Sequence, residues 1–147
     1  MTFLKFIFLT LQPLRRIALT LTATALLGYI AWTLFLIVLI EMGRVVVTVK
    51  TGKAANSFLS DGSDISPLAT RLSGAHSNCV ENFPLVGGTL LLALVTEQHD
   101  ITDPLALWLL LARFGQSCMH LVSGTSRAAQ IRFAFFIMQL GMHQELI

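Results

Sequence analysis

The chain has 147 residues, of which 54% belong to the apolar set AVILMFWYC and only 12% are charged, with a formal net charge of +2. A soluble domain of this size leaves many residues at its surface and needs about twice that charged fraction, so the composition excludes a soluble globular enzyme. It also excludes a disordered chain, and the small net charge gives no reason to expect nucleic acid as a partner. We therefore expect an integral membrane protein forming one domain over residues 1–147, long enough for about four spans of ~20 residues.

The first predicted span covers residues 17–40, a run without any charged residue. This run is longer than the ~7–15-residue apolar core of a cleavable signal peptide, so it predicts a retained membrane helix. We expect the helix to continue past Glu41 and Arg44 toward Lys53. Residues 2–13 are also apolar and end at a proline, which indicates an interfacial or early membrane segment.

A polar loop is predicted between residues 52 and 67, where Ser, Asn, Asp and Gly favour turns. Asp64 or Ser66 can cap the next helix, with Pro67 in its first turn. The second predicted span then covers residues 67–95 and is polar in its first half and apolar in its second.

The third span is predicted over residues 104–123, after a short acidic loop at residues 97–103, and the fourth over residues 127–145. The expected fold class is all-α, a four-helix transmembrane bundle. The whole chain is then a multi-pass protein of the inner membrane in a bacterium or of the endoplasmic reticulum in a eukaryote.

The distribution of Lys and Arg predicts the orientation of this bundle. The basic residues near the spans lie at the ends of the first and third connections, whereas the second connection has none: Arg44, Lys50, Lys53, Arg71 and Arg127. Under the positive-inside rule the first and third loops face the cytoplasm and both termini lie on the opposite side. Lys5, Arg15 and Arg16 argue for the reverse orientation.

Each predicted span carries one stripe of polar residues at helical spacing. The stripes are Glu41, Arg44 and Thr48; Arg71, Gly74, Asn78 and Glu81; Arg113, Gln116 and His120; and Arg132, Gln139 and His143. A charge at the bilayer centre costs about 2.5–3.5 kcal/mol, so such residues face the bundle interior and pair there. We expect one polar pocket shared by all four helices, with Glu81 paired to Arg113 or free for a ligand amine. Cations outnumber the two carboxylates in the stripes, which indicates an anionic ligand; the alternative is that these groups only hold the helices together.

The cysteines and histidines give no sign of a metal site. Cys79 and Cys118 lie in apolar segments, and no Cys/His pair has the spacing of zinc ligands. We expect both cysteines to be small buried residues, with a disulfide or a thiol nucleophile as the alternatives.

The second and third spans resemble segments of a known membrane family. The stretch DGSDISPLATRLSGAHSNCVENFPLVGGTLLLAL resembles the MAPEG family, the membrane-associated proteins of eicosanoid and glutathione metabolism. Arg71, His76, Asn78, Glu81 and Pro84 match the family's motif in this span. In the third span Arg113 matches the family's Arg, and Arg127 matches approximately the Arg that opens the fourth span.

The resemblance implies a four-helix bundle that assembles as a homotrimer and binds glutathione between its helices. The glutathione-binding residues that it implies are Arg44, Arg71, Asn78, Glu81, Arg113 and Arg127. It implies a transferase, peroxidase or isomerase activity on a lipophilic small molecule that arrives through the membrane lipid. His120 and Arg113 are the catalytic candidates, with His120 near the glutathione sulfur.

Four positions depart from the family pattern: Gly74, Ser77, Gln116 and His120. Gly74 stands at the position of an Arg in the family motif, and Ser77 where the eicosanoid-forming members have another Arg. Gln116 and His120 stand where the family has His and Tyr. Two other functions therefore stay open: a non-catalytic member of the fold that binds lipid or another membrane protein, and a small transporter whose deep carboxylate is Glu81.

Overall fold

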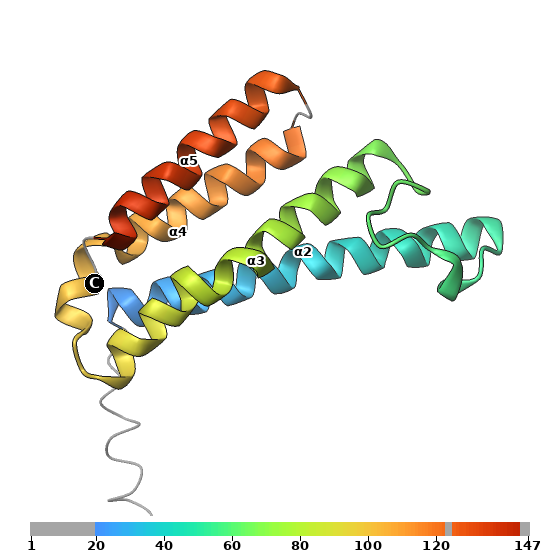
Figure 1. The fold of residues 1–147 in the computed structure, drawn as a ribbon. Coiled ribbons are helices and arrows are strands. Elements are labelled where there is room, and N and C mark those ends of the chain that lie inside the picture. Colours follow the sequence, from blue (N-terminus) through green and yellow to red (C-terminus); the bar gives the residue numbers. More distant parts are fainter. Residues whose placement is uncertain (1–19, 123–124, 145–147) are drawn as a thin grey trace, which may run out of the picture.

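The structure is a computed structural model in which residues 20–122 and 125–144 are described. It contains four long helices, α2 (Leu21–Thr51), α3 (Pro67–Val95), α4 (His99–Val122) and α5 (Ser126–Gln144), and a short 3₁₀ helix, η1 (Ala55–Ser57) (Figure 1). The segment predicted at residues 2–13 lies outside the described residues.

Helix α2 has 31 residues, which at 1.5 Å per residue makes it about 46 Å long. Thr20 caps its first turn by accepting a hydrogen bond from the Ala23 N–H at 3.1 Å. Gly52 ends the helix in the left-handed conformation, with φ of 71°, which glycine adopts without a steric cost. The helix therefore continues past Glu41 and Arg44, as predicted.

Helix α3 begins and ends at the predicted residues. Ser66 caps it by accepting from the Ala69 N–H at 3.1 Å, and Pro67 occupies its first position. Of the two predicted caps, Asp64 is therefore not used; its carboxylate accepts instead from the Lys53 ammonium and from the Leu59 N–H.

Helix α4 begins at His99, five residues before the predicted start. The prediction placed a loop up to Pro104, but Pro104 lies inside the helix, and the acidic Asp100 in the first turn favours the earlier start. The acidic segment instead joins two helices, because Asp103 Oδ1 accepts from the Thr22 N–H of α2 at 2.8 Å and from Thr22 Oγ1 at 2.5 Å.

Helices α2, α3 and α4 each pack against the other two, and α5 packs along α4 (Figure 1). The buried centre combines large side chains, such as Tyr29, Leu36 and Leu109, with small ones such as Ala75 and Ala106. Small residues allow membrane helices to approach closely.

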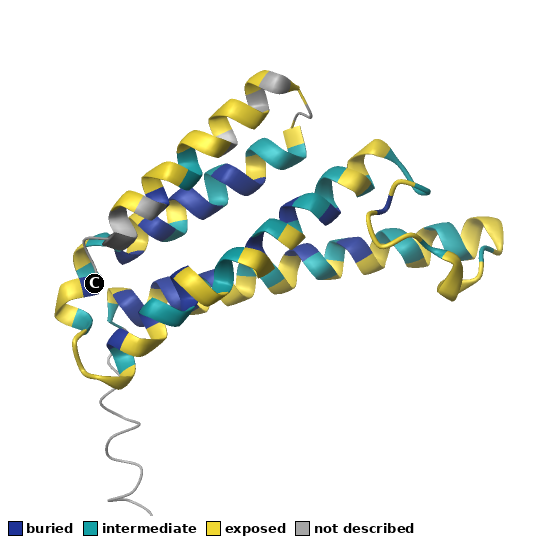
Figure 2. Cartoon of the chain, in the orientation of Figure 1, coloured by how far each residue is buried: buried dark blue, intermediate teal, exposed yellow. Residues whose placement is uncertain are grey.

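The outer faces of the helices are rich in exposed apolar side chains, including Leu34, Val45, Leu92, Trp108 and Phe133, and Figure 2 shows the buried positions on the inner faces. Three of the described helices, α2, α3 and α4, are long and apolar enough to cross a membrane. An apolar exterior around a packed interior is the pattern of a protein surrounded by lipid. The fold is thus all-helical, with three membrane-length helices and α5 as a fourth helix.

Candidate functional site

Arg113 lies at the centre of a hydrogen-bonded network that joins three helices. Its side chain extends from the middle of α4 and is 1% exposed. Nη1 donates to Asn78 Oδ1 of α3 at 2.6 Å and to Gln116 Oε1 of α4 at 2.9 Å, and Nη2 donates to Gln139 Oε1 of α5 at 2.5 Å. One guanidinium group therefore holds α3, α4 and α5 together.

The positive charge of Arg113 has no carboxylate partner in the described parts of the chain. Its hydrogen-bond acceptors are neutral amides, and its buried Nε has no hydrogen-bond partner there. The Tyr29 ring lies beneath it, with 5.4 Å between the guanidinium carbon and the ring centroid, and the Tyr29 hydroxyl donates to the Cys79 carbonyl at 2.8 Å. Dipoles and an aromatic face offset part of the cost of burying a charge, but an anion offsets more.

A cavity of about 480 Å³ lies directly beside this network. Its lining residues come from α3, α4 and α5: Asn78, Glu81, Asn82, Leu85, Gln116, His120, Phe133 and Phe136. Asn78 and Gln116 both line the cavity and bind Arg113, so the guanidinium lies behind the cavity wall. The other wall is aromatic, from α5. The volume is within the usual range of about 300–1,000 Å³ for a small-molecule site.

The structure brings four predicted site residues together at this cavity. Asn78, Glu81 and His120 line it, and Arg113 lies behind them. A Cβ atom on Gly74 would lie 3.7 Å from His120 Nδ1, so the imidazole lies next to the glycine. Two of the departures from the family pattern are therefore neighbours in space.

Glu81 does not pair with Arg113, which corrects one of the predicted pairings. Among the described residues no ion pair joins the two, because Asn78 takes the position next to the guanidinium and Glu81 is one turn farther along α3. Glu81 is exposed in the single chain. Its carboxylate is thus open to a ligand in the cavity.

The three other predicted residues lie elsewhere. Arg71 Nε donates to the Leu121 carbonyl at 2.9 Å and ties the start of α3 to the end of α4. Arg127 is exposed in the first turn of α5. Arg44 forms an ion pair with Glu41 at 2.9 Å and lines a different cavity.

The expected pocket shared by four helices is therefore a pocket of three helices. The polar stripe of α2 lies near its C-terminal end, where the helix runs away from α4 and α5 (Figure 1). Helical spacing predicts which residues share a face, but the direction in which α2 leaves the bundle depends on packing.

Sequence analysis missed the contribution of Tyr29. It is the single tyrosine of the chain and lies in an otherwise apolar span, where a buried hydroxyl needs a hydrogen-bond partner. The presence of a single tyrosine in an apolar span was the feature of the sequence that could have indicated its role. Gln139 belonged to a predicted stripe, but its contact with Arg113 was not predicted.

The described residues form neither a metal-binding cluster nor a disulfide. No group of three or more His, Cys, Asp or Glu residues is placed to hold a metal ion in the described ranges. Cys79 is buried, with its Sγ 3.5 Å from Ser117 Oγ. Cys118 is exposed, contrary to the expectation that both cysteines are buried, and neither cysteine forms a disulfide.

Comparison with known proteins gives one match. The model of the MAPEG family matches residues 13–143, which is most of the chain. No curated protein and no solved structure matches the chain significantly. The family is one of membrane proteins, in agreement with the three membrane-length helices. The chain therefore belongs to the MAPEG family.

Proposed function

We propose that the protein is a membrane enzyme that uses glutathione as co-substrate and joins the glutathione sulfur to an electrophilic carbon of a lipophilic compound. The observation that carries the proposal is the buried Arg113 guanidinium, which has no carboxylate partner in the described chain and adjoins a cavity of suitable size. An unpaired buried cation favours an anionic ligand. Membership of the MAPEG family supports glutathione as that anionic ligand.

Glutathione has chemical groups that complement the cavity. Its carboxylates are attracted by the charge of Arg113, and its amine complements the Glu81 carboxylate. The side-chain amides of Asn78 and Gln116 suit its peptide groups. Phe133 and Phe136 offer an apolar wall to the second substrate, which reaches the site from the surrounding lipid.

The reaction requires the thiolate form of glutathione. A nearby cation lowers the pKa of a thiol, so Arg113 favours loss of the thiol proton to solvent. The thiolate sulfur then forms a bond to an electrophilic carbon, and the bond from that carbon to its leaving group breaks with the electron pair on the leaving group. His120 donates a hydrogen bond to the sulfur before the attack.

The proposed enzyme is a homotrimer with four spans, with its first and third connections in the cytoplasm. Arg44, Arg71 and Arg127 do not adjoin the cavity of a single chain. In this proposal they reach glutathione only across a contact between subunits.

Replacing His120 tests the enzymatic proposal. We expect His120→Phe to fold and to lower glutathione-dependent turnover of a chlorinated dinitrobenzene by about 10²-fold, the usual effect of losing one positioned hydrogen-bond donor. His99→Phe is the matched control, because His99 lies at the opposite end of α4. We expect its turnover to equal that of the wild type.

The rival function is a non-catalytic member of the fold that binds lipid or another membrane protein. It predicts a folded wild-type protein without glutathione-dependent turnover above the uncatalysed rate. That result, or equal turnover in His120→Phe and His99→Phe, contradicts the proposed role of His120.

A further inference from the structure

Gln139 of α5 takes part in the network around Arg113 through both ends of its side-chain amide. The residue is 3% exposed. Its Oε1 accepts from Arg113 Nη2 at 2.5 Å, and its Nε2 donates to Gln116 Oε1 at 3.2 Å. Gln116 Oε1 also accepts from Arg113 Nη1 at 2.9 Å, so the three side chains form a closed ring of hydrogen bonds.

The chemistry of the guanidinium determines how the two amides of this ring are turned. Because an arginine can only donate hydrogen bonds, Gln116 and Gln139 must each turn their oxygen toward Arg113. The NH₂ group of Gln139 is thereby turned away from the guanidinium, and Gln116 Oε1 accepts its hydrogen bond. Gln116 lines the cavity, so Gln139 fixes the orientation of a side chain in the cavity wall.

Gln139 also fixes the rotation of α5 about its own axis. The apolar residues of α5 are spread almost evenly around the helix, so hydrophobicity alone does not decide which face meets α4. Phe133, Phe136 and Gln139 are spaced three residues apart and lie within an arc of about 120° on one side of the helix. The hydrogen bond from Arg113 to Gln139 therefore holds both phenylalanines toward the cavity, where they form its aromatic wall.

The neutral amide of Gln139 leaves the charge of Arg113 uncancelled. Asn78, Gln116 and Gln139 supply oxygen acceptors for the guanidinium but no negative charge. In the described parts of the chain no carboxylate forms an ion pair with Arg113. A carboxylate at position 139 would accept the same hydrogen bond and would also neutralise the cation. The amide thus fixes the guanidinium and keeps its charge for a ligand.

We propose that Gln139 is a positioning residue of the site: its amide fixes Arg113 and Gln116, holds the aromatic wall toward the cavity, and leaves the guanidinium charge available to the anionic ligand. This inference rests on the proposed function, in which glutathione is that ligand. Gln139 acts on the ligand through Arg113 and Gln116, and it makes α5 a part of the site.

Two substitutions separate the charge from the hydrogen bonds. Gln139→Glu keeps the shape and the acceptor for Arg113, but its carboxylate neutralises the cation. Gln139→Met keeps the length and removes both hydrogen bonds, but it leaves the charge of Arg113 unchanged. Gln130→Glu is the matched control, because Gln130 is exposed on α5 and lies about two and a half turns away, on the opposite side of the helix.

Thermal unfolding and calorimetry with glutathione are expected to rank the two variants in opposite orders. Gln139→Glu should unfold at a higher temperature than Gln139→Met, because a carboxylate compensates the buried guanidinium. Its affinity for glutathione should nevertheless fall by at least about tenfold from the wild type, against about 2–10-fold for Gln139→Met. The pKa of the bound thiol, followed by thiolate absorbance, should rise by about one pH unit in Gln139→Glu. Gln130→Glu should match the wild type.

A purely structural role for Gln139 predicts instead that affinity follows stability, so that Gln139→Glu binds glutathione at least as well as Gln139→Met. That order, or an equal thiol pKa in the wild type and Gln139→Glu, overturns the positioning role and leaves the proposed function intact. A Gln139→Glu protein less stable than Gln139→Met also overturns it, because the charge of Arg113 is then not open to a carboxylate. Absence of glutathione binding by the folded wild type contradicts the proposed function, and this inference with it.

Discussion

At the scale of single residues, Gly74 of the family motif lies next to His120, which lines the cavity. A Cβ there meets only His120 Nδ1, at the ordinary contact distance of 3.7 Å. A side chain at this position therefore extends beside the imidazole without a clash at its base. Relatives are expected to have an arginine here, so the glycine removes one cation from the neighbourhood of the cavity.

Restoring that cation tests whether the cavity is an anion site. We expect Gly74→Arg to tighten glutathione binding by about tenfold, because a charge-assisted hydrogen bond contributes about 1.5–3 kcal/mol and part of that is lost in ordering the side chain. Gly74→Gln is the control for added volume and a neutral donor. Equal affinities of the two variants in calorimetry would show that positive charge at this position is irrelevant.

Helical spacing predicted part of the candidate site. Asn78 and Glu81, one turn apart on α3, line the cavity together with His120. The same argument placed Arg44 in the pocket, and there it was wrong for a single chain. Spacing gives the face of a residue on its own helix, whereas the crossing direction of two helices follows from many packing contacts that no local pattern encodes.

At the scale of elements, the helix start that is marked by a capping residue was predicted best. Ser66 and Pro67 indicated the start of α3, and the structure has it there. The start of α4 lies before the predicted one, because Pro104 is inside the helix and does not mark its boundary. Its first turns are fixed by contacts of Asp103 with Thr22, some 80 residues away in sequence, and such a contact cannot be predicted from the local sequence.

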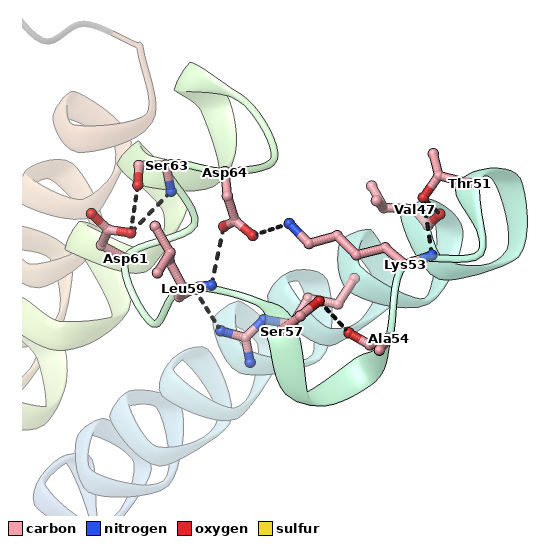
Figure 3. Close-up of polar contacts among 10 residues, drawn as sticks. Val47, Thr51, Lys53, Ala54, Ser57, Leu59, Asp61, Ser63 and Asp64 are labelled. Atoms are coloured by element: carbon pink, nitrogen blue, oxygen red, sulfur yellow. Dashed lines mark hydrogen bonds and ion pairs between the residues drawn. The ribbon is translucent and has the colours of Figure 1, made fainter.

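The loop between α2 and α3 depends on the charge of Asp64, whose carboxylate contacts Lys53 and Leu59 (Figure 3). The Lys53 ammonium, with help from the Leu59 N–H and against the effect of partial burial, holds the pKa of Asp64 below its ordinary value of 3.8. The stabilisation from a lowered carboxyl pKa is complete above the unfolded pKa and is lost as the pH falls through the folded one. The loop contacts are therefore intact at neutral pH and weaken below about pH 4.

Asp64→Ala is expected to expose the Leu59 amide at neutral pH. The wild-type amide donates to Asp64 Oδ1 at 3.2 Å, and loss of one such bond should raise its hydrogen-exchange rate by about 2–10-fold. Asp61→Ala is the control, because Asp61 accepts from Ser63 and not from Leu59. An unchanged Leu59 exchange rate in Asp64→Ala would contradict the role given to this carboxylate.

At the scale of the whole molecule, one chain leaves polar groups of membrane helices uncovered. Glu81 is exposed on α3, and a charge in the hydrocarbon core costs about 2.5–3.5 kcal/mol. In the proposed homotrimer, a second subunit that covers this face would remove the cost. Composition alone predicted the membrane class, because a soluble protein of this size cannot bury so many apolar side chains. Composition does not predict how subunits would be arranged.

We expect native mass spectrometry from mild detergent to show a homotrimer. The trimer should persist on dilution, because the contact buries polar groups that lipid cannot solvate. A chain that stays monomeric at every protein concentration, while retaining its helical content, would contradict this assembly.

The central claim is that the buried Arg113 makes the adjacent cavity a site for glutathione. The most direct measurement is isothermal titration calorimetry of the folded protein with glutathione and with glutathione diethyl ester, which lacks both carboxylates. The account predicts saturable binding of glutathione at or below millimolar concentration and binding of the ester at least tenfold weaker, because only the carboxylates match the guanidinium. Absence of glutathione binding, or equal binding of the ester, would contradict it.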